Sequence, residues 1–334
     1  MTPPLPIPRH RTARKETMVF DGAPARGGVR HLLDLRDLTA DQIRELFRTT
    51  QQLKRTRTDR KDLNGKTLGL LFQKPSVRTR VSFEVGMAEL GGRSLYIGPV
   101  ELEQGKRESS RDLAQVLSRY LHGIVARTFS HQEVVELAQH ARIPVINGLS
   151  DLAHPCQALS DLFTIEERFG KLKGTRIAYV GDGNNVCHSL IQACALMGAE
   201  LALACPARYE PDREILSWGH AAARRSGGQL QLIRSPQKAV RKAQVVYTDV
   251  WTSMGQEKEE RERQRAFQGF QVNRNLLGKA AASAVFMHCL PAHRGEEVTY
   301  DVMDSRRSIV YDQAENRLHV QKAILLLLLK ERKR

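Results

Sequence analysis

The chain has 334 residues, of which 41 % are hydrophobic and 27 % charged, so it is long enough for two ordinary domains and has the composition of a globular protein. Its formal net charge of +15 indicates a surface that attracts anions, but the low aromatic content and the lack of a reading motif argue against a nucleic-acid partner. The one long apolar run, Ile324 to Leu329, is far shorter than the roughly 20 residues needed to cross a bilayer, which argues against a membrane protein.

Residues 1–30 form a segment that is rich in proline and mostly basic. Prolines oppose the amphipathic helix of an organelle transit peptide, so we expect a loosely ordered extension, with transit function as the minor alternative. The chain has five cysteines, an odd number, and no Cys-x-x-Cys pair. This usage indicates a reducing compartment, which we take to be the cytoplasm, and no zinc site.

Strand-like runs alternate with helix-like runs along the rest of the chain. The helix-like runs carry apolar residues at helical spacing, as in Phe83, Met87 and Leu90. The expected strands are 67–72, 94–97, 124–126, 145–146, 176–180, 201–205, 230–233, 245–248, 284–287 and 308–311. This alternation predicts an α/β fold with two doubly wound parallel sheets, each covered by helices on both faces.

The segment 169–174 contains two glycines and interrupts the alternation, so it is the expected junction between two α/β halves. We predict a first domain over 31–165 and a second over 166–315. The apolar run near the end of the chain favours a C-terminal helix, within 316–334, that docks back on the first domain.

The motif Lys74–Arg80 lies between an expected strand and an expected helix that covers 78–90. A helix N-terminus presents unbonded N–H groups and partial positive charge, and arginine adds bidentate phosphate geometry. The motif therefore predicts an anion site. A solvated basic turn is the alternative for such a motif in isolation.

Unusual polar residues follow several other expected strands. In open α/β sheets the ligand lies beyond the carboxyl ends of the strands, so these residues are expected to share one site. They are Arg127 after the third strand, His154 and Gln157 after the fourth, Asn185 after the fifth, Asp249 and Ser253 after the eighth, and Cys289 after the ninth. The apolar residues Met254 and Leu290 belong to the same segments and are expected at the same site.

Each of these residues also has a structural interpretation. His154 precedes a proline suited to a first helical turn, so it could be a capping or core histidine. The loop 181–186 resembles a dinucleotide motif only weakly, because Val186 replaces the third glycine; its two asparagines could cap a helix, although we favour ligand contact through Asn185. Cys289 could be a buried, inert thiol.

The charged segment 256–265 follows Asp249 and Gly255 and is not expected to contribute to the core. It is either a flexible loop with a solvated helix or a mobile lid that hinges near Gly255 and carries ligand contacts. Spacing does not choose between these two interpretations.

Taken together, these motifs resemble the aspartate/ornithine carbamoyltransferase family over about 31–328. Four ordered signatures carry the resemblance, and they are Lys74-Pro75-Ser76-Val77-Arg78-Thr79-Arg80, His154-Pro155-Cys156-Gln157, Asp249 with Ser253-Met254-Gly255, and His288-Cys289-Leu290-Pro291. The resemblance implies a homotrimer with active sites near subunit contacts and neither a metal nor an organic cofactor. The first domain would bind carbamoyl phosphate and the second ornithine.

The resemblance also assigns site residues. It places carbamoyl phosphate at Ser76, Val77, Arg78, Thr79, Arg127, His154 and Gln157, with Cys289, Leu290 and Arg317 closing the site. The implied ornithine contacts are Asn185, Asp249, Ser253 and Met254. One departure is Val77, where the family usually has threonine.

The implied reaction is carbamoyl transfer to the δ-amine of ornithine, as in arginine biosynthesis. Arg127 and His154 would polarise the carbonyl group, while Asp249 and Cys289 would place the amine. Carbamoylation of aspartate, putrescine or acetylornithine is the alternative, and the Ser253-Met254-Gly255 and His288-Cys289 motifs argue against it. The interpretation as a nucleotide-dependent oxidoreductase depends only on the weak dinucleotide motif at 181–186. The interpretation as an RNA- or membrane-binding protein depends only on the net positive charge.

Overall fold

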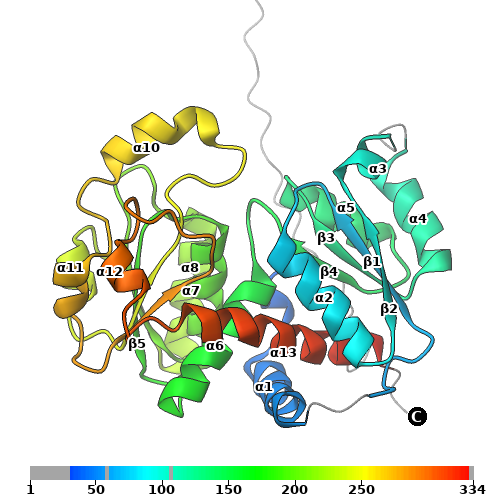
Figure 1. Ribbon diagram of the computed structural model, residues 1–334, viewed down its shortest axis with the longest axis horizontal. Helices are drawn as coiled ribbons and strands as arrows, with labels where there is room; N and C mark the ends of the chain where they lie inside the picture. Colours follow the sequence, from blue (N-terminus) through cyan, green and yellow to red (C-terminus); the bar gives the residue numbers. More distant parts are fainter. Residues whose placement is uncertain (1–30, 57–59, 105–107, 331–334) are drawn as a thin grey trace, which may run out of the picture.

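The computed structural model describes residues 31–56, 60–104 and 108–330 (Figure 1). The expected extension at 1–30 and the last four residues of the expected C-terminal segment lie outside this part of the chain. Figure 1 shows two α/β halves, with helix α13 running from one to the other.

The first half is built on a parallel sheet with strand order β2-β1-β3-β4. Its strands are β1 (Thr67–Phe72), β2 (Arg93–Ile97), β3 (Gly123–Arg127) and β4 (Val145–Leu149). Its helices are η1 (Leu35–Asp37), α1 (Ala40–Arg55), α2 (Val77–Glu89), α3 (Pro99–Gln104), α4 (Ser110–Tyr120), α5 (His131–His140) and α6 (Pro155–Phe169).

The second half carries a parallel sheet with strand order β7-β6-β5-β8-β9. Its strands are β5 (Arg176–Val180), β6 (Glu200–Ala204), β7 (Gln229–Leu232), β8 (Val245–Thr248) and β9 (Val285–His288). Its helices are α7 (Asn185–Met197), α8 (Arg213–Ser226), α9 (Pro236–Ala239), η2 (Glu257–Glu259), α10 (Glu260–Ala266), α11 (Arg274–Gly278) and α12 (Tyr300–Met303).

Alternate residues of the central strands belong to different cores. In β5, Ile177 and Tyr179 belong to a large core shared with the first half, whereas Ala178 and Val180 belong to a second core on the opposite face. In β3, Val125 joins the shared core and the residues on either side of it join a third core. Both faces of each sheet are therefore buried, and the predicted fold of two parallel-sheet α/β halves is confirmed.

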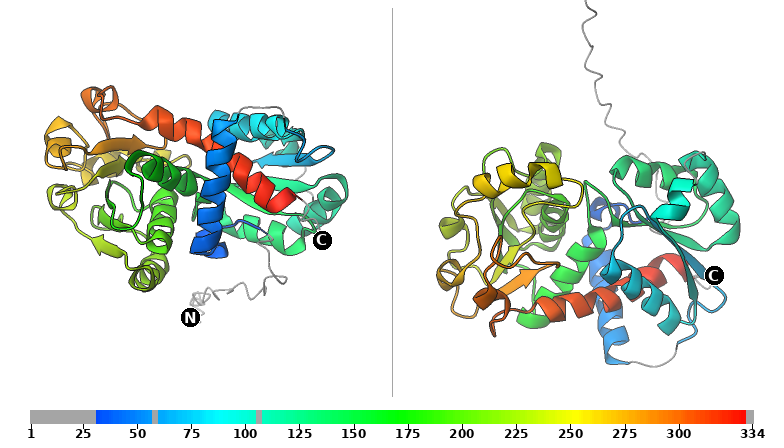
Figure 2. Two further views of the ribbon diagram at one scale, coloured as in Figure 1. Left: turned by 90° about the horizontal axis from the view of Figure 1, so that it is seen from below. Right: turned by 45° about the horizontal axis from the view of Figure 1, so that its top comes forward.

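Helix α13 (Val310–Leu329) joins the halves. It packs on α1, α2 and α6 and also contacts β9, and Figure 2 shows it crossing α1. The prediction that a C-terminal helix packs back on the first domain is confirmed.

The tenth expected strand, 308–311, is wrong. Residue Ser308 makes a single bridge to Phe286 of β9, and α13 begins two residues later. Val310 is buried in the core that covers the outer face of the second sheet. An apolar run of this length is compatible with either a short strand or the buried start of a helix. In the folded chain these residues pack as the start of the helix.

Candidate active site

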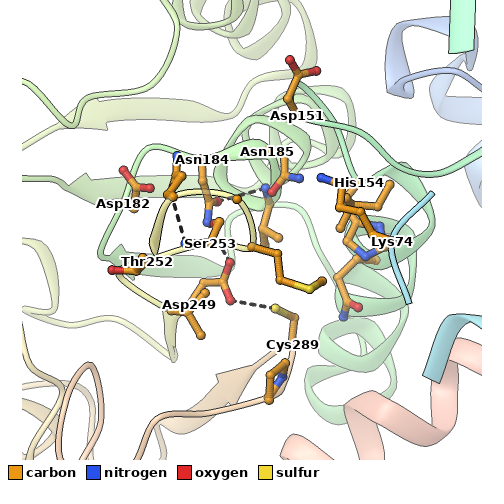
Figure 3. Close-up of a pocket in the computed structure, with 18 of the residues that line it drawn as sticks. Lys74, Asp151, His154, Asp182, Asn184, Asn185, Asp249, Thr252, Ser253 and Cys289 are labelled. Atoms are coloured by element: carbon orange, nitrogen blue, oxygen red, sulfur yellow. Dashed lines mark hydrogen bonds between the residues drawn. The ribbon is translucent and has the colours of Figure 1, made fainter. Parts of the chain in front are cut away.

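A cavity of about 990 Å³ opens between the two halves, at the carboxyl ends of the strands. All of the site residues named from the sequence line it, and they are Ser76, Val77, Arg78, Thr79, Arg127, His154, Gln157, Asn185, Asp249, Ser253, Met254, Cys289, Leu290 and Arg317. Figure 3 shows Lys74 and His154 on one side of this cavity and Asp249 with Ser253 on the other. Parallel topology explains this convergence of residues that are distant in sequence.

The N-terminus of α2 forms one wall of the cavity. Ser76 caps the helix, because its hydroxyl accepts a hydrogen bond from the Thr79 N–H at 3.3 Å. The N–H groups of Val77 and Arg78 lie in the first turn, where no helical acceptor exists. The helix begins at Val77, one residue earlier than predicted. Its first-turn amides and the positive end of its dipole face the cavity.

Three arginines surround this wall. Arg78 donates to the Leu290 carbonyl, and Arg317 donates to Gln157 Oε1 at 2.6 Å and to Thr79 Oγ1 at 3.1 Å. Arg127 Nε is buried and finds no hydrogen-bond partner among the described residues. Burial, followed by the charges of Arg317 and Arg78, lowers the pKa of Arg127 to about 10. Arg127 and Arg317 are buried and Arg78 is half-buried, and a cluster of cations of this kind requires an anion.

His154 lies beside this cluster. Its backbone N–H donates to Ser189 Oγ at 2.8 Å, and its buried Nδ1 has no partner in the part of the chain that the structure describes. Burial lowers the pKa of His154 well below its ordinary value, and Arg317, Arg127 and Arg78 lower it further, so the ring is neutral. It occupies the N-cap position of α6 without a side-chain capping bond, so the capping interpretation is wrong.

The opposite wall presents a carboxylate and a thiol. Asp249 accepts a hydrogen bond from Asn184 Nδ2 at 2.8 Å and another from the Cys289 thiol at 3.0 Å (Figure 3). Burial and the Asp249 charge raise the pKa of Cys289 well above its ordinary value, so the thiol stays protonated. Cys289 is therefore a hydrogen-bond donor at this site, and its pKa does not favour nucleophilic attack.

The two asparagines after β5 have different structural roles. Asn184 caps α7 by accepting from the N–H groups of Val186 and Cys187, whereas Asn185 Nδ2 donates to the Ser150 carbonyl of the first half. A Cβ at Gly183 would lie 2.3 Å from the Pro211 nitrogen. Gly183 is therefore required because the chain packs closely against it. Its presence does not need a bound dinucleotide as an explanation, so the dinucleotide interpretation of this loop loses its main support.

The charged segment after Gly255 contains one residue that the sequence interpretation missed. Arg263 of α10 is buried, and Nη1 donates to Asp182 at 2.8 Å and to the Trp251 carbonyl at 3.0 Å. The expectation that this segment does not contribute to the core is wrong at this position. The available signal was helical spacing, since Arg263 lies four residues before the buried Phe267.

Lys74, the first residue of the predicted anion motif, was not named among the ligands but also lies in the cavity wall. Its ammonium group is buried and lies 4.6 Å from the centre of the Phe129 ring. Burial lowers the pKa of Lys74, and the nearby Arg127 lowers it further. Lys74 therefore adds a fourth cation to the side of the cavity that requires an anion.

Two groups of potential metal ligands lie near the cavity. The atoms of Asp249, His288 and Cys289 approach within 4.8 Å of one another, as do those of His293, Glu296 and Glu297. In the first group, His288 Nδ1 accepts from the Leu290 N–H and Nε2 faces Glu297, while the protonated thiol donates to Asp249. The ligand atoms of this first group are already committed to hydrogen bonds, either within the group or with Leu290 and Glu297, which fits a metal poorly.

Comparison with known proteins agrees with these observations. Residues 30–167 match the carbamoyl-P binding domain of the aspartate/ornithine carbamoyltransferase family, and residues 173–328 match its Asp/Orn binding domain. A protein of Pyrococcus horikoshii named ornithine carbamoyltransferase is 52 % identical over 303 residues, which are 90 % of this chain and 96 % of that relative.

Solved structures give the same result. The ornithine carbamoyltransferase from Pyrococcus furiosus is 51 % identical with a TM-score of 0.89, and the match covers 92 % of this chain and 99 % of that one. The ornithine carbamoyltransferase from Thermus thermophilus is 46 % identical with a TM-score of 0.82, and the match covers 90 % and 99 % of the two chains. The chain belongs to the aspartate/ornithine carbamoyltransferase family.

Proposed function

We propose that the chain transfers the carbamoyl group of carbamoyl phosphate to the δ-amine of L-ornithine, giving L-citrulline and phosphate. One observation carries the proposal: Arg127 Nε and His154 Nδ1, which are buried and have no hydrogen-bond partner among the described residues, lie across the cavity from the Asp249 and Cys289 pair. A small anion on one wall and an amine on the other match this arrangement. The relatives named above bear the corresponding name.

The phosphate group would occupy the N-terminus of α2, held by Ser76, Arg78 and Thr79. Arg127 and His154 would donate to the carbonyl oxygen as negative charge develops there during attack. Preorganised donors of this kind each contribute about 10²–10³ in rate. The C–N bond forms, the bond from carbon to the bridging oxygen breaks, phosphate leaves with the electron pair, and the amine loses one proton.

The amine must be neutral to attack, yet a free alkyl amine has a pKa of about 10.4. Asp249 would hold the ornithine side chain near the Cys289 thiol, and Asn185, Ser253 and Met254 would hold its α-amino acid group. The rate is therefore expected to rise with pH. Val77 supplies a backbone N–H to the phosphate but lacks the hydroxyl that threonine would add.

We also propose that the chain works as a homotrimer. An apolar stripe on α2, formed by Val77, Val81 and Val85, is exposed. Exposed apolar surface of this kind is typical of an interface between subunits. Because Val77 also lines the cavity, a neighbouring subunit on this stripe would lie next to the active site.

A cytoplasmic role in arginine biosynthesis completes the proposal. All five cysteines lie in the described part of the chain and are free thiols, as a reducing compartment would leave them. None of the helices in that part is long and apolar enough to cross a bilayer. The Pyrococcus furiosus relative carries the name "Ornithine carbamoyltransferase, anabolic".

The test supplies carbamoyl phosphate with ornithine, aspartate, putrescine or acetylornithine in turn and measures the carbamoylated product. Ornithine is expected to react faster than the other amines by orders of magnitude. The polar groups of the site are arranged to bind ornithine, and another amine would leave some of them without hydrogen-bond partners. A faster reaction with any other amine would overturn the assignment.

A further inference from the structure

A fully buried carboxylate, Asp161 of α6, lies where the two halves meet. Its Oδ1 accepts hydrogen bonds from Gln157 Nε2 at 2.8 Å and from Gln313 Nε2 at 2.7 Å. Its Oδ2 accepts from the hydroxyl of Tyr247, on β8, at 3.0 Å. Three elements that are far apart in sequence, α6, β8 and α13, thus meet at one carboxyl group, which the reaction described above does not use.

This carboxylate fixes the orientation of the Gln157 side-chain amide. An ionised carboxylate can only accept hydrogen bonds, so the group that faces Asp161 must be the amide nitrogen. The other end confirms the same orientation, because Gln157 Oε1 accepts from Arg317 Nη1 at 2.6 Å. Burial raises the pKa of Asp161 to about 6, so the carboxylate is ionised at pH 7.5.

The orientation matters because Gln157 lines the cavity. A carbonyl oxygen has two lone pairs, so Gln157 Oε1 can accept a second hydrogen bond besides the one from Arg317. The phosphate and the carbonyl oxygen of carbamoyl phosphate are acceptors and cannot face it. The amino group is the one hydrogen-bond donor of that substrate and is therefore the group that Gln157 Oε1 can bind.

We propose that Asp161 is a positioning residue that makes the site selective for a carbamoyl over an acetyl donor, by holding the Gln157 oxygen toward the cavity. Acetyl phosphate has nearly the same size and charge, but a methyl group replaces the amino group. It would leave the Gln157 oxygen without its donor, which costs free energy in a buried site. This inference rests on the proposed function and names a determinant of its donor specificity.

A purely structural role for Asp161 has to be separated from this one. Gln313 also accepts from the His288 N–H at 2.9 Å, so loss of the network would loosen the contact between the halves. Tyr247 provides the matched control. Its hydroxyl donates to the same carboxylate through Oδ2, away from Gln157, and accepts from Gln313 Nε2 at 3.2 Å. Tyr247→Phe therefore removes two bonds of the network and leaves the bond from Gln157 to Asp161 in place.

The experiment measures the KM for carbamoyl phosphate and the inhibition constant Ki of acetyl phosphate, with ornithine as acceptor, and takes Ki divided by KM as the selectivity. In Asp161→Leu the Gln157 amide nitrogen loses its hydrogen-bond acceptor, so the side-chain amide can rotate and no longer holds its oxygen toward the cavity. Selectivity is therefore expected to fall by about 10- to 100-fold. In Asp161→Asn the oxygen of the new asparagine amide can still accept a hydrogen bond from Gln157, and its nitrogen can face the Tyr247 hydroxyl. Most of the selectivity should therefore remain. Tyr247→Phe should lower the melting temperature and leave the selectivity unchanged.

Two results would overturn the proposal. One is a folded Asp161→Leu protein with the selectivity of the wild type, and the other is an equal loss of selectivity in Tyr247→Phe. If Asp161→Leu does not fold, Asp161→Ser replaces it with the same expected loss, because the shorter side chain does not reach the Gln157 amide. A wild-type protein that forms no citrulline would instead refute the proposed function, which keeps the two failures distinct.

Discussion

At the scale of single residues, the site is defined by donors that the protein itself leaves without partners. Arg127 and His154 are buried, and each has one nitrogen that finds no acceptor among the described residues. A buried polar group without a hydrogen-bond partner lowers the free energy of unfolding. An anionic ligand, and the negative charge that develops on the carbonyl oxygen during the reaction, would supply the missing hydrogen-bond acceptors.

The first prediction concerns Arg127→Met. We expect kcat to fall by about 10²–10³, because one donor to the carbonyl oxygen is lost. The melting temperature should stay the same or rise, since a buried cation close to Arg78 and Arg317 is removed. Citrulline assays and thermal unfolding measure the two effects. Arg142→Met, at an exposed position, is the matched control, and a large loss of stability in Arg127→Met would contradict this account.

The second prediction concerns the pH dependence of stability through His154. The pKa of His154 is lowered well below its ordinary value of about 6.5, so the unfolded state binds more protons once the pH falls below that value. The free energy of unfolding should therefore decrease as the pH falls from 7.5 to 5.5. Urea unfolding at both pH values should show a smaller decrease in His154→Asn. An equal decrease in the two proteins would show that His154 is not responsible.

At the scale of elements, α10 is tied to the rest of the second half through one side chain. The Arg263 guanidinium bonds Asp182 in the loop after β5 and the Trp251 carbonyl in the loop after β8. Trp251 also stacks on Phe267, with ring centres 5.6 Å apart. These contacts hold the loop that carries Ser253 against the loop that carries Asn184, so the segment is anchored to the second half by buried side chains.

The third prediction tests this attachment. Arg263→Met should raise the KM for ornithine by about tenfold, the effect of losing about 1.4 kcal/mol of loop positioning, and change the KM for carbamoyl phosphate much less. Steady-state kinetics with each substrate varied measures the difference. Arg261→Met, on the exposed face of the same helix, is the control. Equal increases in both KM values would argue against a role specific to the ornithine wall.

At the scale of the whole molecule, the exposed stripe on α2 makes assembly testable. The fourth prediction is that the wild type has a mass near three times the 37.7 kDa chain, and that Val81→Glu shifts it toward the single chain. A charge buried at an apolar interface lacks a partner and weakens it. Sedimentation measures the mass. Leu232→Glu, exposed on β7 of the second half, is the control, and a trimeric Val81→Glu protein would place the interface elsewhere.

The sequence by itself determined the order of nine of the strands, their parallel arrangement and the residues that gather at their carboxyl ends. Hydrophobic alternation and turn residues act over neighbouring positions, so they specify each element locally. Parallel topology then brings every strand end to one edge. The sequence did not distinguish the start of α13 from a tenth strand, because both would bury the same short apolar run.

Only the tertiary structure decided which polar residues are buried. Arg263 lies in a segment whose composition indicates a solvated helix, yet it is buried against Asp182, 81 positions away. Asp161 meets the Tyr247 hydroxyl across 86 positions. Burial of a charge is stable only where distant parts of the chain supply its partners, and no local pattern records where those partners will lie.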